Sequence, residues 1–191
     1  MALSRTKGKF ESVLTPVAVR VPLSPNVLTL LAVLVMAVAA VEVMQSNFML
    51  AAALIILSGF IDVLDGTVAK AKNKTTSFGA FADRVGDRIS DALIFGSIVL
   101  AGFVQLWLGL VVLVLVLLGS YASACLEAFS KTRIGEAFSM RAVRLLLVVV
   151  GLLLASYTGL ISYMEYIFAI IAVLAIAALV QRLWVSYRLL K

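Results

Sequence analysis

Residues 62–91 read DVLDGTVAKAKNKTTSFGAFADRVGDRISD and connect two long apolar segments of the chain. This run contains five of the ten acidic residues of a protein that is otherwise strongly hydrophobic. A carboxylate that moves from water toward hydrocarbon loses several kcal/mol unless a cation or dense hydrogen bonding compensates. Such a concentration of acids therefore indicates a functional site, and the simplest such site is one that binds metal.

Four of these acids are paired at helical spacing. Asp62 and Asp65 are three residues apart, and Asp83 and Asp87 are four residues apart. On two helices each pair projects from one face, so two facing pairs form a cage of four carboxylates. Oxygen ligands without His or nearby Cys favour hard divalent cations, Mg²⁺, Mn²⁺ or Ca²⁺, over zinc or copper.

Small and basic residues lie between the two acidic pairs. Gly66, Ala69 and Gly79 leave room for a flat and bulky group, and Gly79 shares a helical face with Asp83. The lysines that follow offer cations to an anionic group that the metals would also hold; they are Lys70, Lys72 and Lys74. A metal, a phosphate and a flat ring together suggest a nucleotide.

This pattern resembles the signature of the CDP-alcohol phosphotransferases, D-x2-D-G-x2-A-R-x8-G-x3-D-x3-D. Seven of its eight fixed positions agree with this sequence, which reads Asp62-x2-Asp65-Gly66-x2-Ala69-Lys70-x8-Gly79-x3-Asp83-x3-Asp87. The one departure is Lys70, where the family has Arg; lysine keeps the charge but lacks the planar fork for bidentate phosphate contact. We expect weaker or differently angled diphosphate binding in an enzyme that remains active.

The resemblance implies a reaction of phospholipid biosynthesis. A phosphatidyl-type or archaetidyl-type group passes from a CDP-linked lipid to an alcohol, and CMP is released. The resemblance further implies that Asp62, Asp65 and Asp83 bind metal, while Asp87 is the general base and also touches a second ion, so two Mg²⁺ or Mn²⁺ ions are expected. It suggests a homodimer, and it predicts a CDP pocket lined by Asp62, Gly66, Ala69, Lys70 and Gly79.

The composition is that of an integral membrane protein. The chain has 191 residues, is 63% hydrophobic with a mean hydropathy of +1.14, and carries 14% charged residues, where soluble domains average about 25%. At roughly 20 apolar residues per transmembrane helix, this length accommodates about six helices and no separate soluble domain. We therefore expect a single all-α membrane domain over residues 1–191. The only cysteine, Cys125, gives no disulfide framework.

The chain divides into a short first segment and a helical bundle. Residues 1–25 alternate basic and apolar side chains at helical spacing, which predicts an amphipathic helix at the membrane interface with a break near Pro16. Asn26 and Thr29 match a P-N-x-x-T run that the family often carries; these groups either contact the nucleotide or only cap the helix. Residues 26–191 are expected to form six transmembrane helices, at 26–44, 48–68, 77–102, 106–128, 140–158 and 163–184.

The distribution of positive charge predicts the topology. All sixteen Lys and Arg residues fall in the amino-terminal segment, around the connection of the second and third helices, around the loop between the fourth and fifth, or in the tail. The positive-inside rule therefore predicts a multi-pass cell-membrane protein with both termini and the acids at the cytoplasmic side. The net charge of +6 suits membrane lipid headgroups and phosphates as partners, and nucleic acid is not expected to bind.

The acceptor is less sharply defined by the sequence. Arg133, Arg141 and Arg144 lie at the cytoplasmic ends of two predicted helices, where they either bind a phosphorylated acceptor or only follow the positive-inside rule. Family members that use inositol phosphate or glycerophosphate often carry S-Y-x-R-A-R-x-E, whereas residues 120–127 read SYASACLE, and Met140 stands where a glutamate is usual. Inositol phosphate is the first expectation for the small polar alcohol, with glycerol phosphate or serine as alternatives.

A cation-coupled membrane transporter is the alternative from another class, because carboxylates in membrane helices also mark ion pathways. It predicts acids near the bilayer midplane and a repeat between the two halves of the chain. Here the acids lie at one end of their helices, and the last three predicted helices contain only Glu127 and Glu165.

The remaining acid of the run, Asp91, is expected to pair with Arg88. Arg84 and Arg88 are expected to balance local charge.

Overall fold

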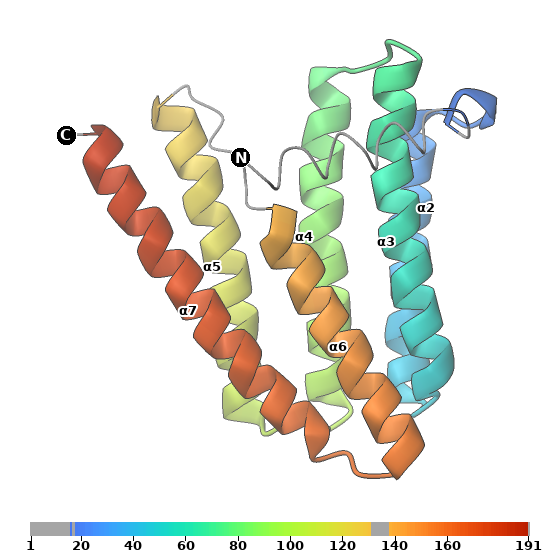
Figure 1. Cartoon of the computed structure of the whole chain (residues 1–191), viewed down its shortest axis with the longest axis vertical. Coiled ribbons are helices and arrows are strands. Elements are labelled where there is room, and N and C mark those ends of the chain that lie inside the picture. The colour runs from blue at the N-terminus through green and yellow to red at the C-terminus, as the bar shows by residue number, and fades with distance from the viewer. Residues whose placement is uncertain (1–15, 17, 131–137, 191) are drawn as a thin grey trace.

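A computed structural model describes residues 16, 18–130 and 138–190, and in this part of the chain all regular structure is helical. Figure 1 shows the helices running side by side along the long axis of the molecule. The turn between the second and third of them lies at one end, together with the carboxyl terminus, while the other short turns lie at the opposite end. The helices are α2 (Pro25–Met44), α3 (Phe48–Ala71), α4 (Ser77–Leu100), α5 (Leu106–Ser130), α6 (Phe138–Thr158) and α7 (Tyr163–Leu190).

Local sequence signals explain where the helices begin and end. Pro25 begins α2, where its missing N–H group costs no hydrogen bond. The side chain of Thr76 caps α4 by accepting a hydrogen bond of 3.0 Å from the backbone N–H of Gly79. Between α3 and α4, Asn73 has a φ of 51°, a left-handed conformation that asparagine tolerates better than most residues. The turn that follows α3 is therefore tight, and it reverses the chain so that α3 and α4 both run along α2, on which each of them packs.

Packing inside the bundle is apolar, and so is most of its outer face. The main core contains Phe95 of α4 and Phe168 of α7, whose ring centroids lie 5.7 Å apart at an edge-to-face angle of 74°. Large apolar side chains such as Leu34 and Val38 of α2 are exposed on the outside. A soluble protein would bury such residues, whereas a bilayer accommodates them.

Five of the helices are long and apolar enough to cross a membrane: α2, α3, α5, α6 and α7. The prediction of an all-helical, multi-pass membrane protein is thereby confirmed. The remaining helix, α4, carries more charge than these five, because it contains Asp83, Arg84, Asp87, Arg88 and Asp91. The count of six transmembrane helices stays a prediction that depends on α4.

The predicted helix ranges match closely, with one notable difference. The last helix continues past the expected end at residue 184 to Leu190. Its extension contains Arg188, whose guanidinium lies 4.3 Å from the ring centroid of Trp184 one turn earlier. The predicted helix ended at residue 184 because the polar residues beyond it lie outside the hydrocarbon region of the membrane. Such residues do not interrupt a helix, so α7 continues.

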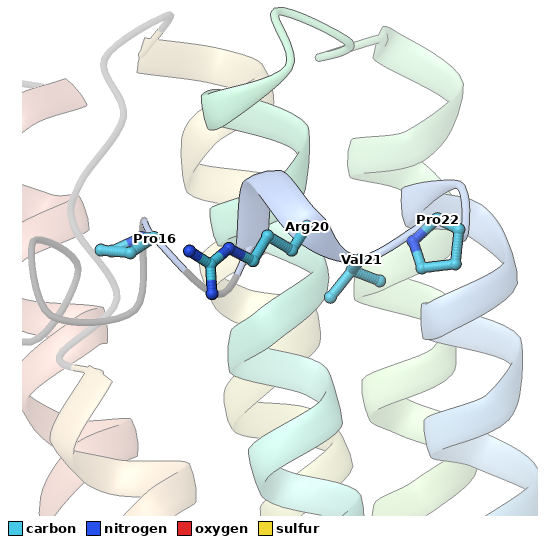
Figure 2. A pocket seen from close by; sticks show the side chains of 4 residues that line it. All are labelled: Pro16, Arg20, Val21 and Pro22. Atoms are coloured by element: carbon cyan, nitrogen blue, oxygen red, sulfur yellow. The ribbon is translucent and has the colours of Figure 1, made fainter.

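The segment before α2 packs on the bundle. Ala18 is buried against a small apolar cluster formed by α2 and α3, and the amine of Lys72 donates a hydrogen bond to the backbone carbonyl of Val21. Pro16 and residues 18–20 are helical. Most of the predicted amphipathic helix, residues 1–15 and 17, lies outside the described residues. A hollow of about 400 Å³ opens beside this segment, and Figure 2 shows the side chains that line it: Pro16, Arg20, Val21 and Pro22.

Candidate active site

Three of the four predicted acids come together between α3 and α4. Asp62, Asp83 and Asp87 each offer a carboxylate oxygen, and these oxygens all lie within 4.8 Å of one another. Asp83 and Asp87 are one turn apart on α4, so both face Asp62 across the helix pair. All three side chains are half-buried. The helical spacing read from the sequence thus produces the expected convergence of charge.

The donor set fits a hard divalent cation. It consists of carboxylate oxygens alone, which suit Mg²⁺ and Mn²⁺. Three like charges at this separation repel one another, and partial burial strengthens the repulsion. Oδ1 of Asp87 is buried and accepts no well-aligned hydrogen bond within the described residues. The cluster therefore has the concentrated charge and the carboxylate oxygens that a metal ion requires.

Asp65 lies apart from this group of three. It is buried, with 4% of its surface exposed, and its Oδ2 accepts a hydrogen bond of 2.5 Å from the hydroxyl of Thr29 on α2. Its charge still interacts with those of Asp62 and Asp83. The hydroxyl of Thr29 is thus directed at a carboxylate, so its contact with a nucleotide, like the metal contact of Asp65, stays a prediction.

The small residues of the motif border the acids. An added Cβ atom at Gly66 would meet nothing within 4 Å, so open space lies beside this exposed residue. At Gly79 a Cβ atom would lie 3.1 Å from Oγ1 of Thr76 and 3.2 Å from Oδ1 of Asn26. Asn26 and Gly79 are therefore neighbours, although they come from different helices. Ala69 is half-buried and Lys70 is exposed one turn after Gly66.

Arg141 of α6 enters the acidic cluster directly. Its Nη1 donates a hydrogen bond of 2.9 Å to Oδ2 of Asp62 and forms an ion pair of 2.5 Å with Oδ1 of Asp87. The sequence analysis placed this arginine near an acceptor but did not predict its contact with the acids that are expected to bind metal. One feature of the sequence could have predicted this contact, because several half-buried carboxylates need a cation beside them. Arg133, the first arginine of the predicted acceptor set, lies outside the described residues.

Asp91 contacts more cations than the sequence suggested. The predicted pair with Arg88 is confirmed, with Nη1 of Arg88 3.8 Å from Oδ2 of Asp91. Two arginines of α6 lie as close: Nε of Arg141 is 3.6 Å from Oδ1, and Nη2 of Arg144 is 3.4 Å from Oδ2. Arg84 instead pairs with Glu127 of α5 at 2.6 Å. The basic residues of α6 therefore meet the acids of α4 in the membrane bundle.

Comparison with known proteins identifies one family and several relatives of this chain. The sequence profile of the family described as CDP-alcohol phosphatidyltransferase matches residues 22–184. The archaetidylinositol phosphate synthase of Methanothermobacter thermautotrophicus is 33% identical over 99% of this chain and 96% of its own length. The archaetidylinositol phosphate synthase of Pyrococcus horikoshii is 39% identical over 52% of this chain and 50% of its own.

Solved structures resemble the whole bundle. The Mycobacterium tuberculosis phosphatidylinositol phosphate synthase with CDP-DAG bound superposes with a TM-score of 0.80 at 26% identity, over 92% of this chain and 94% of that one. The same enzyme in complex with manganese and citrate gives a TM-score of 0.78 at 27% identity, over 91% and 88% of the two chains. The likeness includes the helices that carry the acids.

Proposed function

Because this chain belongs to the CDP-alcohol phosphatidyltransferase family, we propose that it transfers a phosphatidyl-type or archaetidyl-type group from a CDP-linked lipid to inositol phosphate and releases CMP. The observation that carries this proposal is the convergence of Asp62, Asp83 and Asp87 within 4.8 Å beside Arg141. Relatives named as inositol phosphate lipid synthases support the acceptor, since one of them matches nearly the full chain.

Asp62, Asp83 and Asp87 would hold Mg²⁺ or Mn²⁺, and Asp65 is proposed to join them in a site for two ions. A relative crystallised in complex with manganese supports this assignment. When bound, the cations neutralise charge on the diphosphate and make CMP a better leaving group. Asp65 lies three residues after Asp62 on the same helix, so its carboxylate would join the cluster by turning from Thr29 toward the other acids.

The donor would lie over the short turn between α3 and α4. The open space beside Gly66, the half-buried Ala69 and the close approach of Asn26 to Gly79 support a nucleotide pocket there. Lys70 adds a cation for the diphosphate. A relative with CDP-DAG bound supports the same class of donor, and the lipid tails would leave along the exposed apolar faces of α2 and α3.

Asp87 is the proposed general base. It accepts the proton of the acceptor hydroxyl; the hydroxyl oxygen then forms a bond to the lipid-linked phosphorus, and the phosphoanhydride bond to CMP breaks. Its ion pair with Arg141 holds the carboxylate in one orientation. Because Arg141 and Arg144 lie beside the base, they are proposed to bind the phosphate of the acceptor, together with Arg133.

The proposed topology places this site at the cytoplasmic side of the cell membrane. The acids, the α3–α4 turn and the basic residues of α6 gather toward one half of the bundle, which agrees with the positive-inside rule. In this arrangement α4 is the sixth transmembrane helix, and its acids Asp87 and Asp91 are paired with arginines of α6. A homodimer stays a prediction.

The experiment that tests the function is an acceptor screen with the purified full chain. CDP-archaeol and CDP-diacylglycerol serve as donors with Mg²⁺, and CMP release is measured with inositol phosphate, glycerol phosphate or serine. Rapid CMP release with inositol phosphate alone is expected. CMP release with glycerol phosphate or serine, and not with inositol phosphate, would show that the proposed acceptor is wrong. No release with any of the three would reject the proposed function.

A further inference from the structure

The innermost charged group of the bundle is Asp91, which is 0% exposed. It lies one turn beyond Asp87 on α4, about 6 Å further along the helix. Three arginines from two helices surround it: Arg88, Arg141 and Arg144. The motif that identifies the family ends at Asp87, so Asp91 has no role in the reaction described above.

The arginines around Asp91 retain unused hydrogen-bonding capacity. Each guanidinium has about five N–H donors, whereas the Asp91 carboxylate offers about four acceptor positions. Within the described residues, Nη1 of Arg88, Nε of Arg141 and Nε of Arg144 are buried without a hydrogen bond, although the first two lie 3.8 and 3.6 Å from oxygens of Asp91. The side chain of Arg144 is only 8% exposed. Three guanidinium groups carry more donors than one carboxylate accepts, so the cluster has donors for a further acceptor-rich group.

The ion pairs of Asp91 cross between two helices that are not close neighbours. The backbone of α6 packs closely against α3 and α7, and that of α4 packs against α2 and α5. Long arginine side chains therefore reach from α6 to Asp91 without close packing of α6 on α4. Asp91 fixes where these flexible side chains point, because a buried carboxylate binds guanidinium groups strongly.

We propose that Asp91 is a positioning residue for the acceptor: it orients Arg141 and Arg144 so that their remaining N–H donors face the acceptor phosphate beside Asp87. Asp91 itself does not touch the acceptor. This inference rests on the proposed function, because it concerns the same site and requires a phosphorylated alcohol. A residue that only tied α4 to α6 would contribute to the stability of the fold but not to the binding of one substrate in particular.

The test measures how Asp91→Asn, made in the full chain, changes the KM of each of the two substrates separately. CMP release is measured with inositol phosphate varied at saturating CDP-lipid, and then with CDP-lipid varied at saturating inositol phosphate. We expect the KM for inositol phosphate to rise about 10- to 100-fold, as for the loss of one or two charge-assisted hydrogen bonds. The KM for CDP-lipid is expected to change less than about twofold.

Two further variants keep the test decisive. Glu127→Gln removes a carboxylate that pairs with Arg84 and not with the arginines around Asp91, and is expected to leave both KM values unchanged. Asp91→Glu keeps the charge on a side chain that is longer by one methylene group, so a smaller rise in the acceptor KM than in Asp91→Asn is expected; if Asp91→Asn does not fold, that rise, with the KM for CDP-lipid unchanged, decides in its place.

Equal changes in both KM values, or an unchanged acceptor KM, would overturn the positioning role. These outcomes are distinct from a failure of the proposed function itself. In that case the wild-type protein would not release CMP with inositol phosphate at all. If wild type is active and Asp91→Asn shows the wild-type acceptor KM, only the inference about Asp91 fails.

Discussion

Nη1 of Arg141 lies 2.5 Å from Oδ1 of Asp87, the last acid of the motif. The same nitrogen lies 2.9 Å from Oδ2 of Asp62. A guanidinium thus contacts two of the three carboxylates that are proposed to bind metal. Arg141 and a divalent cation therefore compete for the same oxygens and repel each other, while both are needed to hold phosphates. The predictions below start from this arrangement.

Replacing Arg141 is expected to tighten metal binding. In Arg141→Gln the carboxylates of Asp62 and Asp87 lose a competing cation, so Mn²⁺ affinity should rise about tenfold, which corresponds to roughly 1.4 kcal/mol. Acceptor binding should weaken at the same time. Titration of Mn²⁺ into the purified protein, followed by paramagnetic resonance, measures the first effect. Arg84→Gln is the control, and weaker Mn²⁺ binding in Arg141→Gln would contradict the proposed competition.

Removing the base should separate binding from turnover. Asp87→Asn keeps the shape of the side chain but cannot accept the hydroxyl proton, so CMP release should fall about 10²- to 10⁴-fold. The variant should still bind CDP-lipid, because Lys70 and the small residues of the pocket are intact. Binding is measured with radiolabelled CDP-lipid. Undiminished CMP formation would exclude Asp87 as the base.

Replacing Lys70 by the arginine that the family motif carries at this position is expected to be tolerated. Lys70 is exposed at the end of α3, so Lys70→Arg fits without repacking and adds the planar fork that binds a phosphate with two hydrogen bonds. The KM for CDP-lipid should stay the same or fall up to about tenfold. Kinetics with varied CDP-lipid provide the measurement, and complete loss of donor binding would contradict the assignment.

The hydrogen bond between Thr29 and Asp65 should support both the fold and the metal site. Thr29→Val keeps the side-chain shape but leaves a buried carboxylate without this donor. A loss of about 1–3 kcal/mol in the free energy of unfolding is expected, with weaker Mn²⁺ binding. Thermal unfolding and Mn²⁺ titration measure the two effects, and Thr29→Ser, which retains the hydroxyl, should behave like wild type. Wild-type stability in Thr29→Val would show that the bond contributes little.

Helical periodicity was enough to predict that Asp62 meets Asp83 and Asp87, but not that Asp65 lies apart from them beside Thr29. Asp62 and the pair Asp83 and Asp87 lie on facing sides of two adjoining helices, and the short turn between these helices fixes their pairing. The apolar segments likewise predicted the helices, because a chain in a bilayer must satisfy its backbone hydrogen bonds within each segment. These features depend on residues close together in the sequence.

Contacts between distant helices could not be predicted in the same way. Arg141 and Asp62 are 79 residues apart, and their meeting depends on how α6 is rotated and how deeply it is inserted. That placement comes from packing details such as Gly151, where an added Cβ atom would lie 2.8 Å from Sδ of Met164 on α7. No periodic pattern in the sequence encodes such a fit, so the two α6 arginines beside Asp91 appear only in the structure.

The most direct test of the account compares CMP release by wild type and Asp83→Asn, each with Mn²⁺ and with a chelator, using CDP-lipid and inositol phosphate. Asp83 contributes an oxygen to the cluster from the centre of the motif. The account predicts Mn²⁺-dependent release by wild type and a loss of at least about 10²-fold in Asp83→Asn. Release by wild type that persists in the chelator, or wild-type release by Asp83→Asn, would contradict it.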